Sequence, residues 1–249
     1  MIAAGRVEAL KLARSLVGAI ASVALIGGTL ALVGGIAAAV RSGNEDVIAQ
    51  VGPHATPDWP GLLATGTQIT AAGGMVGFGV VLTWMLGREF TDGTITGLFA
   101  LPVSRGRIAV AKHAVYGLWV VAVSLVLTAA LGLLGVALGY GAPTPSIWAG
   151  LGRHLALGVL TGAVVVPVAW VATLARSVLA GVGCTIGLVA LAQVGALAGA
   201  GGWFPLAAPA LWALDPAQVS GIQVALATAV PAVFVPLTWL GWQRLELDR

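Results

Sequence analysis

Residues 87–112, GREFTDGTITGLFALPVSRGRIAVAK, form the longest polar interruption between two long apolar segments. They include four of the chain's 12 lysines and arginines, together with the carboxylates of Glu89 and Asp92. A short apolar segment, residues 94–101, lies between these charges. Because the flanking segments are long enough to cross a bilayer, the stretch predicts a loop outside the membrane that meets another molecule.

The composition of the chain is that of an integral membrane protein. Of its 249 residues, 59% are hydrophobic and 8% are charged, whereas a soluble domain has about 25% charged residues. The mean hydropathy is +1.00. The net charge is only +3, and the basic residues stand singly at the ends of apolar runs. This pattern argues against a nucleic-acid partner.

Six apolar segments each reach the roughly 20 residues that a helix needs to cross a bilayer. They are residues 15–40, 61–86, 108–138, 147–174, 178–198 and 219–240. The sequence therefore predicts an all-α integral membrane protein, with one transmembrane domain over residues 1–249. A phosphate-binding loop needs Gly-x-x-x-x-Gly-Lys-Ser/Thr, but Lys11 precedes Leu12 and Lys112 precedes His113. No nucleotide-binding domain is expected in this chain.

The basic residues predict the orientation of the spans, because cytoplasmic loops carry an excess of lysine and arginine. If both termini are cytoplasmic, ten basic residues fall inside and only Arg41 and Arg153 fall outside. The inner set consists of Arg6, Lys11, Arg14, Arg88, Arg105, Arg107, Lys112, Arg176, Arg244 and Arg249.

Two further segments are predicted at the membrane surface. Residues 1–14 interleave basic and apolar side chains. They predict either a short amphipathic helix in the headgroup region or a basic flank of the first span. Residues 199–218 are apolar but are interrupted by three prolines, which predicts a broken outer or re-entrant segment before the sixth span.

The polar residues inside the spans are few. No Asp, Glu, Lys or Arg lies in the middle of a predicted span, which disfavours an ion-coupled carrier because such carriers use intramembrane charges. The uncharged polar residues are candidates for a translocation path, with hydrogen bonds between helices as the alternative. The candidates retained are Thr67, Gln68, Gln193 and Gln223.

No catalytic or metal-binding residues are expected. His54 and His154 are predicted outside and His113 inside. The two outer histidines, with Asp58, leave two interpretations open: an outer metal site or ordinary interfacial residues. No Gly-x-Ser-x-Gly sequence is present to indicate a serine hydrolase.

Within the polar loop, the sequence predicts a short helix over residues 93–101. Asp92 precedes Gly93 and Thr94, and its side chain is a suitable N-cap because a carboxylate accepts hydrogen bonds from free backbone N–H groups. Pro102 would end the helix.

This helix would carry one apolar stripe, because Ile95, Leu98 and Phe99 are spaced by three and four residues. A helix so short is not stable alone. It needs a packing partner, which is either a groove in another protein or the surface of the membrane.

The same loop resembles that of ABC-2-type permeases. The shared features are an acidic residue, a Gly-Thr pair, a short apolar helix, a Pro-Val-Ser-Arg run and a following lysine. In this chain they are Glu89, Gly93-Thr94, residues 95–101, residues 102–105 and Lys112. The resemblance covers the whole chain in layout, but only residues 88–112 in sequence.

This resemblance implies the membrane subunit of an ATP-driven exporter in a bacterial cell membrane. Two permease subunits, identical or different, would form the path within the lipid. Two separate ATPase subunits would bind ATP and Mg²⁺, so this chain itself would not be an enzyme. The loop helix would be the coupling helix that contacts the ATPase.

The residues that the resemblance assigns to coupling are Glu89, Asp92, Gly93, Thr94, Ile95, Leu98, Phe99, Pro102 and Arg105. Glu89 would pair with Arg88 or with a basic residue of the N-terminal helix. The outer loop between the first two spans is short, as in permeases for drugs or peptides. The apolar spans, with a few Thr and Gln groups, favour amphipathic or lipid-like cargo.

Three other functions stay open on the sequence alone. One is a secondary carrier that works without an ATPase. Another is a membrane enzyme or metal protein that uses His54 and His154. The third is an assembly or anchor protein that transports nothing.

Overall fold

The structure is a computed structural model, and it describes residues 2–99 and 102–246. Every regular element in these ranges is a helix, so the predicted all-α membrane fold is confirmed. Residues 100–101 of the expected loop helix and Arg249 of the basic set lie outside the described residues.

Six helical segments are long and apolar enough to cross a membrane, as predicted. The first joins α2 (Leu16–Val23), the π-helical turn η1 (Ala24–Gly28) and α3 (Thr29–Arg41). The fourth joins α8 (Pro145–Val164) and α9 (Pro167–Leu174). The other four are α5 (Trp59–Thr91), α7 (Arg105–Ala137), α10 (Val178–Leu197) and α12 (Gly221–Gln243).

The fourth span, which was predicted as one segment, is interrupted at a proline. Pro167 has no backbone N–H and its ring clashes with a preceding helical turn, so α8 ends at Val164 and α9 restarts at Pro167. Pro231 and Pro236 lie inside α12, which nevertheless continues through them. Prolines are tolerated in membrane helices because neighbouring groups satisfy the freed carbonyls.

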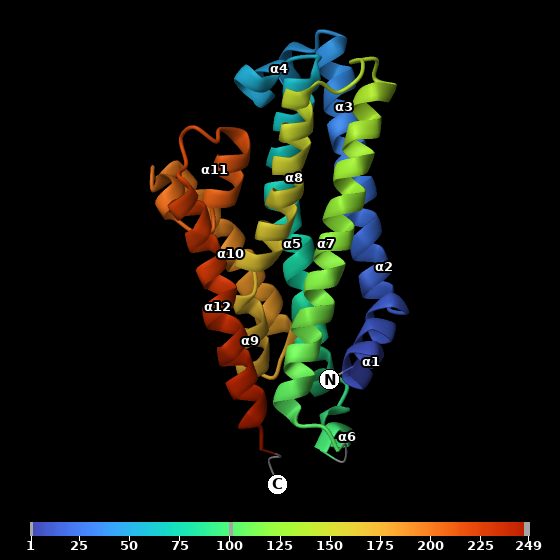
Figure 1. The fold of residues 1–249 in the computed structure, drawn as a ribbon, viewed down its shortest axis with the longest axis vertical. Coiled ribbons are helices and arrows are strands. Elements are labelled where there is room, and N and C mark those ends of the chain that lie inside the picture. Colours follow the sequence, from blue (N-terminus) through green and yellow to red (C-terminus); the bar gives the residue numbers. More distant parts are fainter. Residues whose placement is uncertain (1, 100–101, 247–249) are drawn as a thin grey trace.

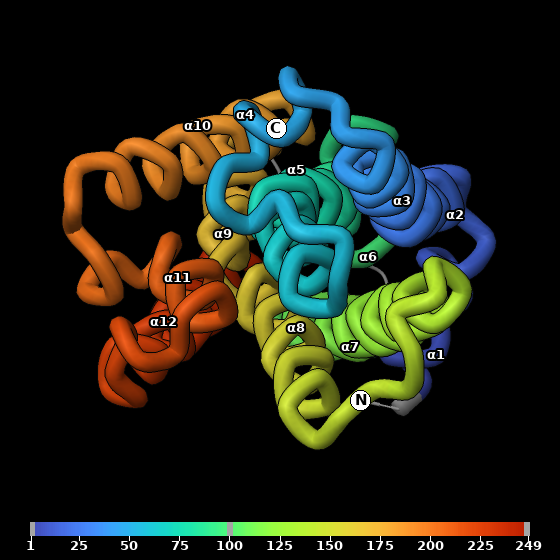
Figure 2. The backbone as a smooth tube through the Cα atoms, turned by 90° about the horizontal axis from the view of Figure 1, so that it is seen from above, coloured from blue at the N-terminus to red at the C-terminus, as the bar shows by residue number. Residues whose placement is uncertain are grey.

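The bundle is organised around α5. Seen along the bundle axis, α5 is surrounded by α3, α7, α8, α9 and α10 (Figure 2). In the most apolar stretch of α5, 56% of the residues are buried, against 17% in α10 and 11% in α12. The last two helices therefore form the periphery of the bundle, and most residues of their apolar stretches are not buried within it.

The bundle has two unlike ends (Figure 1). One end carries the short helices α1 (Ile2–Ala13) and α6 (Ile95–Phe99) and the C-terminal ends of α9 and α12. We call it the basic end, because nine of the ten predicted inner basic residues belong to these elements, to the adjoining turns, to the C-terminal end of α5 or to the first turns of α7.

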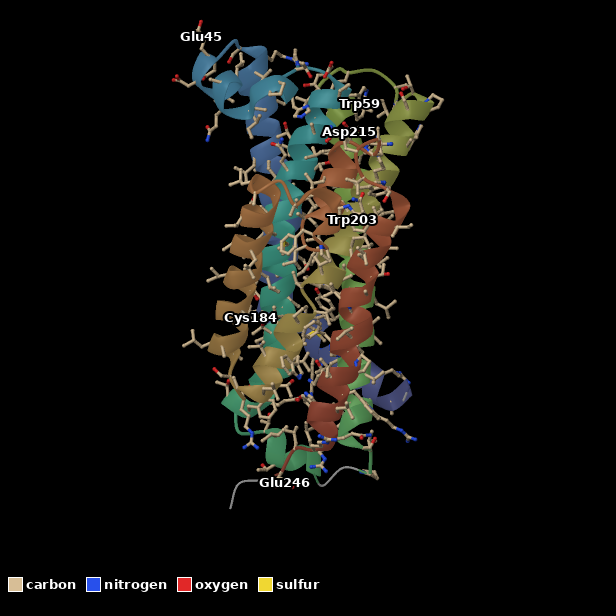
Figure 3. All side chains as sticks on the ribbon, turned by 90° about the vertical axis from the view of Figure 1, so that its left-hand side faces the viewer. Glu45, Trp59, Cys184, Trp203, Asp215 and Glu246 are labelled. Atoms are coloured by element: carbon tan, nitrogen blue, oxygen red, sulfur yellow. The ribbon has the colours of Figure 1, made fainter. Side chains whose placement is uncertain are left out.

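The opposite end carries the short helices between the spans. Glu45 marks it in Figure 3, whereas Glu246 marks the basic end. The elements there are α4 (Glu45–Val51), η2 (Gly52–His54), η3 (Gly201–Trp203) and α11 (Ala208–Leu214). η3 and α11 occupy the segment that the prolines predicted to be broken, and α11 packs against α5, α8 and α12.

Candidate functional site

The polar loop is shorter in the structure than the sequence analysis predicted. α5 continues past the expected end of its span to Thr91, and α7 begins at Arg105. Glu89 and Lys112 therefore belong to the long helices, and the connection between these helices is residues 92–104. α6 lies in this connection, at the tip of the basic end (Figure 1).

Asp92 does not cap the loop helix, so this prediction was wrong. It is the C-cap of α5, where its backbone N–H donates to the carbonyl of Arg88 and its carboxylate lies 3.7 Å from the Arg88 guanidinium. Gly93 follows with φ of +68°, a conformation that favours glycine. This turn extends α5 beyond the point where the sequence suggested a loop, and α6 starts only at Ile95.

Two residues of the expected apolar stripe of α6 face the protein itself. Ile95 and Leu98 are half-buried and pack against the main hydrophobic core, as does Val103. The side chain of Phe99 is outside the described part of the structure. Among the described residues of this connection, the exposed ones are Asp92, Gly93, Thr94, Thr96, Gly97, Pro102 and Ser104.

The start of α7 is tied to the C-terminal segment. The Arg105 guanidinium donates to the carbonyl of Leu245, a residue that is buried in the main core. Gly106 lies against Trp239, where even a methyl group would meet the indole ring at 2.6 Å. The start of α7 is thus held against α12 and the residue Leu245 that follows it.

A cluster of four charges lies at the same end of the bundle and includes one residue from each of the two helices that flank this connection. The Lys112 ammonium donates to Glu8 Oε2 at 2.7 Å and to Glu89 Oε1 at 2.9 Å. The Lys11 ammonium donates to Glu8 Oε1 and Glu89 Oε1, both at 2.9 Å. Glu8, Glu89 and Lys112 are buried, and Lys112 is 0% exposed. We call these four residues the ionic cluster; it joins α1, α5 and α7.

The cluster is neutral as a whole, which is why it can be buried. Two ammonium groups alternate with two carboxylates, so each desolvated charge has opposite charges beside it. Glu89 Oε2 alone makes no hydrogen bond within the described residues. Removing any one member would leave an uncompensated charge in a low-dielectric interior.

Trp242 connects the ionic cluster to the last span. The Lys112 ammonium lies 5.7 Å from the centroid of this indole ring, within reach of a cation–π interaction. The indole N–H donates to Thr173 Oγ1 at 3.1 Å, and the ring packs edge-on against Phe90. α9 and α12 are therefore coupled to the same charges as α1, α5 and α7.

The two α1 members of the cluster have shifted pKa values. Burial alone would raise the pKa of Glu8, but the charge of Lys112 and the hydrogen bonds from both lysines lower it below 4.5. Burial would lower the pKa of Lys11, but its hydrogen bonds to Glu8 and Glu89 raise it above 10.5. Both residues are charged at neutral pH.

Sequence reasoning placed Glu89 in the coupling set and considered two partners for it. The structure shows the partner from the N-terminal helix, Lys11, whereas Arg88 instead lies over the Trp84 ring at 4.6 Å and near Asp92. Glu8 was missed altogether. Its signal was its position as the only acidic residue before Glu45, three residues from a lysine.

The predicted path residues separate into two groups. Gln68 and Gln193 line the same cavity of about 200 Å³ between α5, α8, α10 and α11. Most of its other lining residues are apolar, with Thr161 as a further polar group. Thr67 is buried and does not line the cavity, and Gln223 completes the capping box of Ser220 at the start of α12.

His154 is not at an outer surface, contrary to the prediction. It is 2% exposed inside the bundle, where its two ring nitrogens lie 3.0 Å from Thr70 Oγ1 and 2.9 Å from Thr128 Oγ1. These hydrogen bonds join α8 to α5 and α7. An outer metal site formed with His54 and Asp58 is therefore not supported.

One of two comparisons with known proteins gives a match, and it agrees with this architecture. A comparison with curated proteins finds no match. A protein-family model described as ABC-2 family transporter protein matches residues 6–192, which include the ionic cluster and the first four spans. The match covers three quarters of the chain, and the six helices fit a short permease. The chain therefore belongs to the ABC-2 transporter family of membrane proteins.

Proposed function

We propose that this chain is the permease subunit of an ATP-driven exporter. Two permease subunits would form the translocation path, and two separate ATPase subunits would bind ATP and Mg²⁺. The observation that carries this proposal is the connection 92–104, which projects from the basic end of a six-span chain of the ABC-2 family. The chain has no phosphate-binding loop of its own.

The orientation belongs to the same proposal. The ten-to-two distribution of basic residues supports an orientation in which the basic end and both termini face the cytoplasm, and the family resemblance favours a bacterial cell membrane. α6 would then be accessible to a cytoplasmic ATPase.

We infer that coupling uses the exposed side of the α6 connection. Thr94, Thr96 and Gly97 are exposed there, whereas Ile95 and Leu98 pack inward. An ATPase that pushes on the exposed side would press Ile95 and Leu98 against the core. At the same end of the bundle, the ionic cluster links α5 and α7 to α1, and Trp242 extends the link to α12. This chain of contacts supports transmission of the movement to the spans.

The cavity with Gln68 and Gln193 is the candidate for part of the path. Its lining is mostly apolar, with two amides and one hydroxyl and no charged side chain. Such a surface suits an amphipathic drug, peptide or lipid-like molecule better than a small ion.

The proposal is tested by purifying the chain from native membranes in mild detergent and measuring co-purified ATPase. The wild type is expected to retain a nucleotide-binding protein in stoichiometric amount. Deletion of residues 94–101, or Phe99→Asp, should abolish this association and transport while membrane insertion persists. A wild-type chain that purifies alone, without recoverable ATP hydrolysis, would contradict the proposal and favour a secondary carrier.

A matched pair of substitutions tests which side of α6 makes the contact. Thr96→Arg changes an exposed residue and is expected to remove the ATPase without changing the thermal midpoint. Leu98→Ala changes a residue packed on the core, so it is expected to lower the thermal midpoint while the ATPase still associates. The opposite pattern would place the docking surface on the apolar side.

A further inference from the structure

A groove between α9 and α12 opens at the basic end of the bundle. Its volume is about 360 Å³, and its apolar walls include Trp170, Leu174, Leu237 and Leu240. Leu174 and Leu240 are 58% and 37% exposed, so the groove is open to the surroundings of the bundle. In a membrane-spanning helix pair, those surroundings are lipid acyl chains.

Two guanidinium groups stand at the mouth of this groove. Arg176 follows the last turn of α9, and Arg244 is the C-cap of α12, so both lie where the apolar walls end. Both side chains are exposed. The Arg176 guanidinium donates to the carbonyl of Glu246 at 3.2 Å, which holds it across the gap between the two helix ends.

Arg176 occupies a backbone position that favours glycine. Its φ is +48°, and it is the one non-glycine residue with positive φ in the described part of the chain. Its N–H donates to Thr173 and that of Ser177 donates to Ala172, the bond pattern of a Schellman helix end. Glycine would adopt this conformation without strain, so arginine is favoured here through the contacts of its side chain, which include the carbonyl of Glu246.

Chemistry identifies the class of molecule that fits such a groove. Apolar walls alone do not select among membrane lipids, because every acyl chain is equally apolar. Guanidinium groups bind phosphate oxygens through charge-assisted hydrogen bonds. Basic pockets between membrane helices near the bilayer surface bind anionic headgroups.

We propose that the α9–α12 groove binds an anionic glycerophospholipid of the leaflet at the basic end. One acyl chain lies along Trp170, Leu237 and Leu240, and the phosphate contacts Arg176 and Arg244. The site concerns the surrounding membrane and not the transported substrate, so it stands independently of the proposed transport function.

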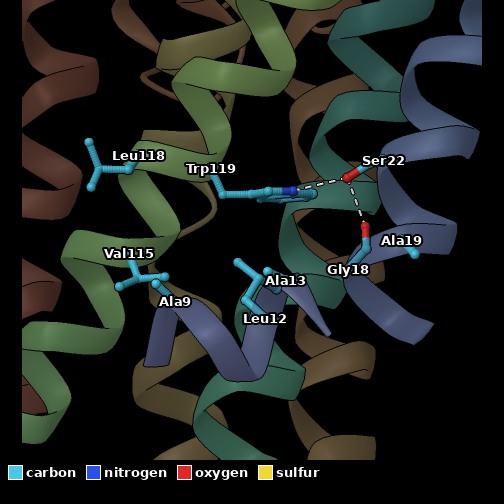
Figure 4. Close-up of a pocket in the computed structure, with 9 residues that line it drawn as sticks. All are labelled: Ala9, Leu12, Ala13, Gly18, Ala19, Ser22, Val115, Leu118 and Trp119. Atoms are coloured by element: carbon cyan, nitrogen blue, oxygen red, sulfur yellow. Dashed lines mark hydrogen bonds between the residues drawn. The ribbon is translucent and has the colours of Figure 1, made fainter. Parts of the chain in front are cut away.

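A second groove in the same chain provides an internal comparison. It lies between α1, α2 and α7 and also has a volume of about 360 Å³ (Figure 4). None of its lining residues is charged. Trp119 donates to Ser22 at 3.0 Å, and Ser22 donates to the carbonyl of Gly18 at 2.7 Å, so its polar groups bond to one another. This groove therefore has no charged side chain that could select an anionic headgroup.

Native mass spectrometry of the purified full chain tests the proposal. The protein is titrated with phosphatidylglycerol and, separately, with phosphatidylcholine of the same acyl chains. The wild type is expected to bind one phosphatidylglycerol in preference to phosphatidylcholine. Arg244→Gln and Arg176→Gln should each weaken phosphatidylglycerol binding about fivefold, as expected for the loss of one basic residue near the membrane surface. Binding of phosphatidylcholine should change less than about twofold.

Two further variants separate lipid binding from general effects. Arg176→Gly removes the guanidinium but suits the backbone, so it is expected to fold as well as the wild type and still lose phosphatidylglycerol preference. Arg14→Gln removes an exposed basic residue of the same end, outside the α9–α12 groove, and should leave binding unchanged.

Three results would overturn the proposal. One is equal affinity of the wild type for the two lipids. Another is a loss of binding in Arg14→Gln as large as that in Arg244→Gln. The third is dissociation of a chain dimer by Arg244→Gln without any change in bound lipid, which would make the groove a contact between copies of this chain.

Discussion

At the residue scale, Lys112 shows how a membrane protein accommodates a charge. Its ammonium is fully buried and is compensated by Glu8 and Glu89 and by the face of Trp242. Its identity as a lysine was visible in the sequence, but its burial was not. The contact to Glu8 spans 104 positions, and each residue taken alone resembles an ordinary charged flank of a span.

Substitution of Lys112 by methionine is expected to lower the free energy of unfolding by about 3–5 kcal/mol, because Glu8 and Glu89 would share only the Lys11 charge. Combining it with Glu89→Gln should restore most of the loss, since the remaining Glu8–Lys11 pair is neutral. Thermal or denaturant unfolding of the single and double variants in detergent gives the coupling energy. Arg107→Met, an exposed change on the same helix, is the control. Additive effects of Lys112→Met and Glu89→Gln would show that the two charges do not interact.

The ionic cluster also predicts how stability depends on pH. The pKa of Glu8 is lowered from 4.5 in the folded state, so its contribution is present above 4.5 and is lost as the pH falls below that value. The pKa of Lys11 is raised from 10.5, so its contribution is lost as the pH rises above 10.5. Between these two pH values, Glu8 and Lys11 should cause no change of the thermal midpoint with pH. Glu8→Gln should lower the thermal midpoint at neutral pH and should reduce the fall of the midpoint at acidic pH. A fall at acidic pH as large as that of the wild type would contradict the assignment to Glu8.

At the scale of elements, the six spans were predictable because hydrophobic length alone defines them, and all six are found within a few residues. The ends of α5 and of the loop helix were not. Asp92 had the chemistry of an N-cap, but hydrogen bonding of its own backbone to Arg88 made it the end of the preceding helix. His154 was misplaced because a residue near the start of a span can face either the headgroups or the bundle, and only packing between α5, α7 and α8 decides which.

The turn between α5 and α6 offers a matched pair of glycines. A side chain at Gly93 or at Gly97 would meet nothing within 4 Å, but only Gly93 has positive φ, at +68°. Gly93→Ala is therefore expected to weaken the local structure by about 1–2 kcal/mol. Gly97→Ala should be neutral or stabilising by up to about 1 kcal/mol, because alanine is the better helix former. Hydrogen exchange of the amides in residues 95–99 measures both, and equal protection in the two variants would show that the turn is not strained by a side chain.

At the scale of the whole molecule, the two ends differ in charge, and this difference predicts how the chain lies in the membrane. Replacing the single cysteine, Cys184, by alanine allows one new cysteine to be placed at Glu45 or at Thr96, both exposed and at opposite ends. An impermeant maleimide added to intact cells is expected to label Glu45→Cys and not Thr96→Cys until the membrane is opened. Labelling of Thr96→Cys in intact cells would reverse the orientation and exclude a cytoplasmic ATPase at α6.

The continuity of α5 has a mechanical consequence. This helix runs without a break from its Asp58 cap to Thr91, about 50 Å at 1.5 Å per residue, whereas the neighbouring fourth span is interrupted before Pro167. A continuous helix, which bends little, therefore lies beside a span that can bend at its break. A tilt of about 5° about the basic end would carry the far end of α5 by roughly 4 Å. If α6 transmits movement as proposed, a small displacement at the basic end would be magnified at the level of Gln68, where the α5 side of the cavity would move away from α8.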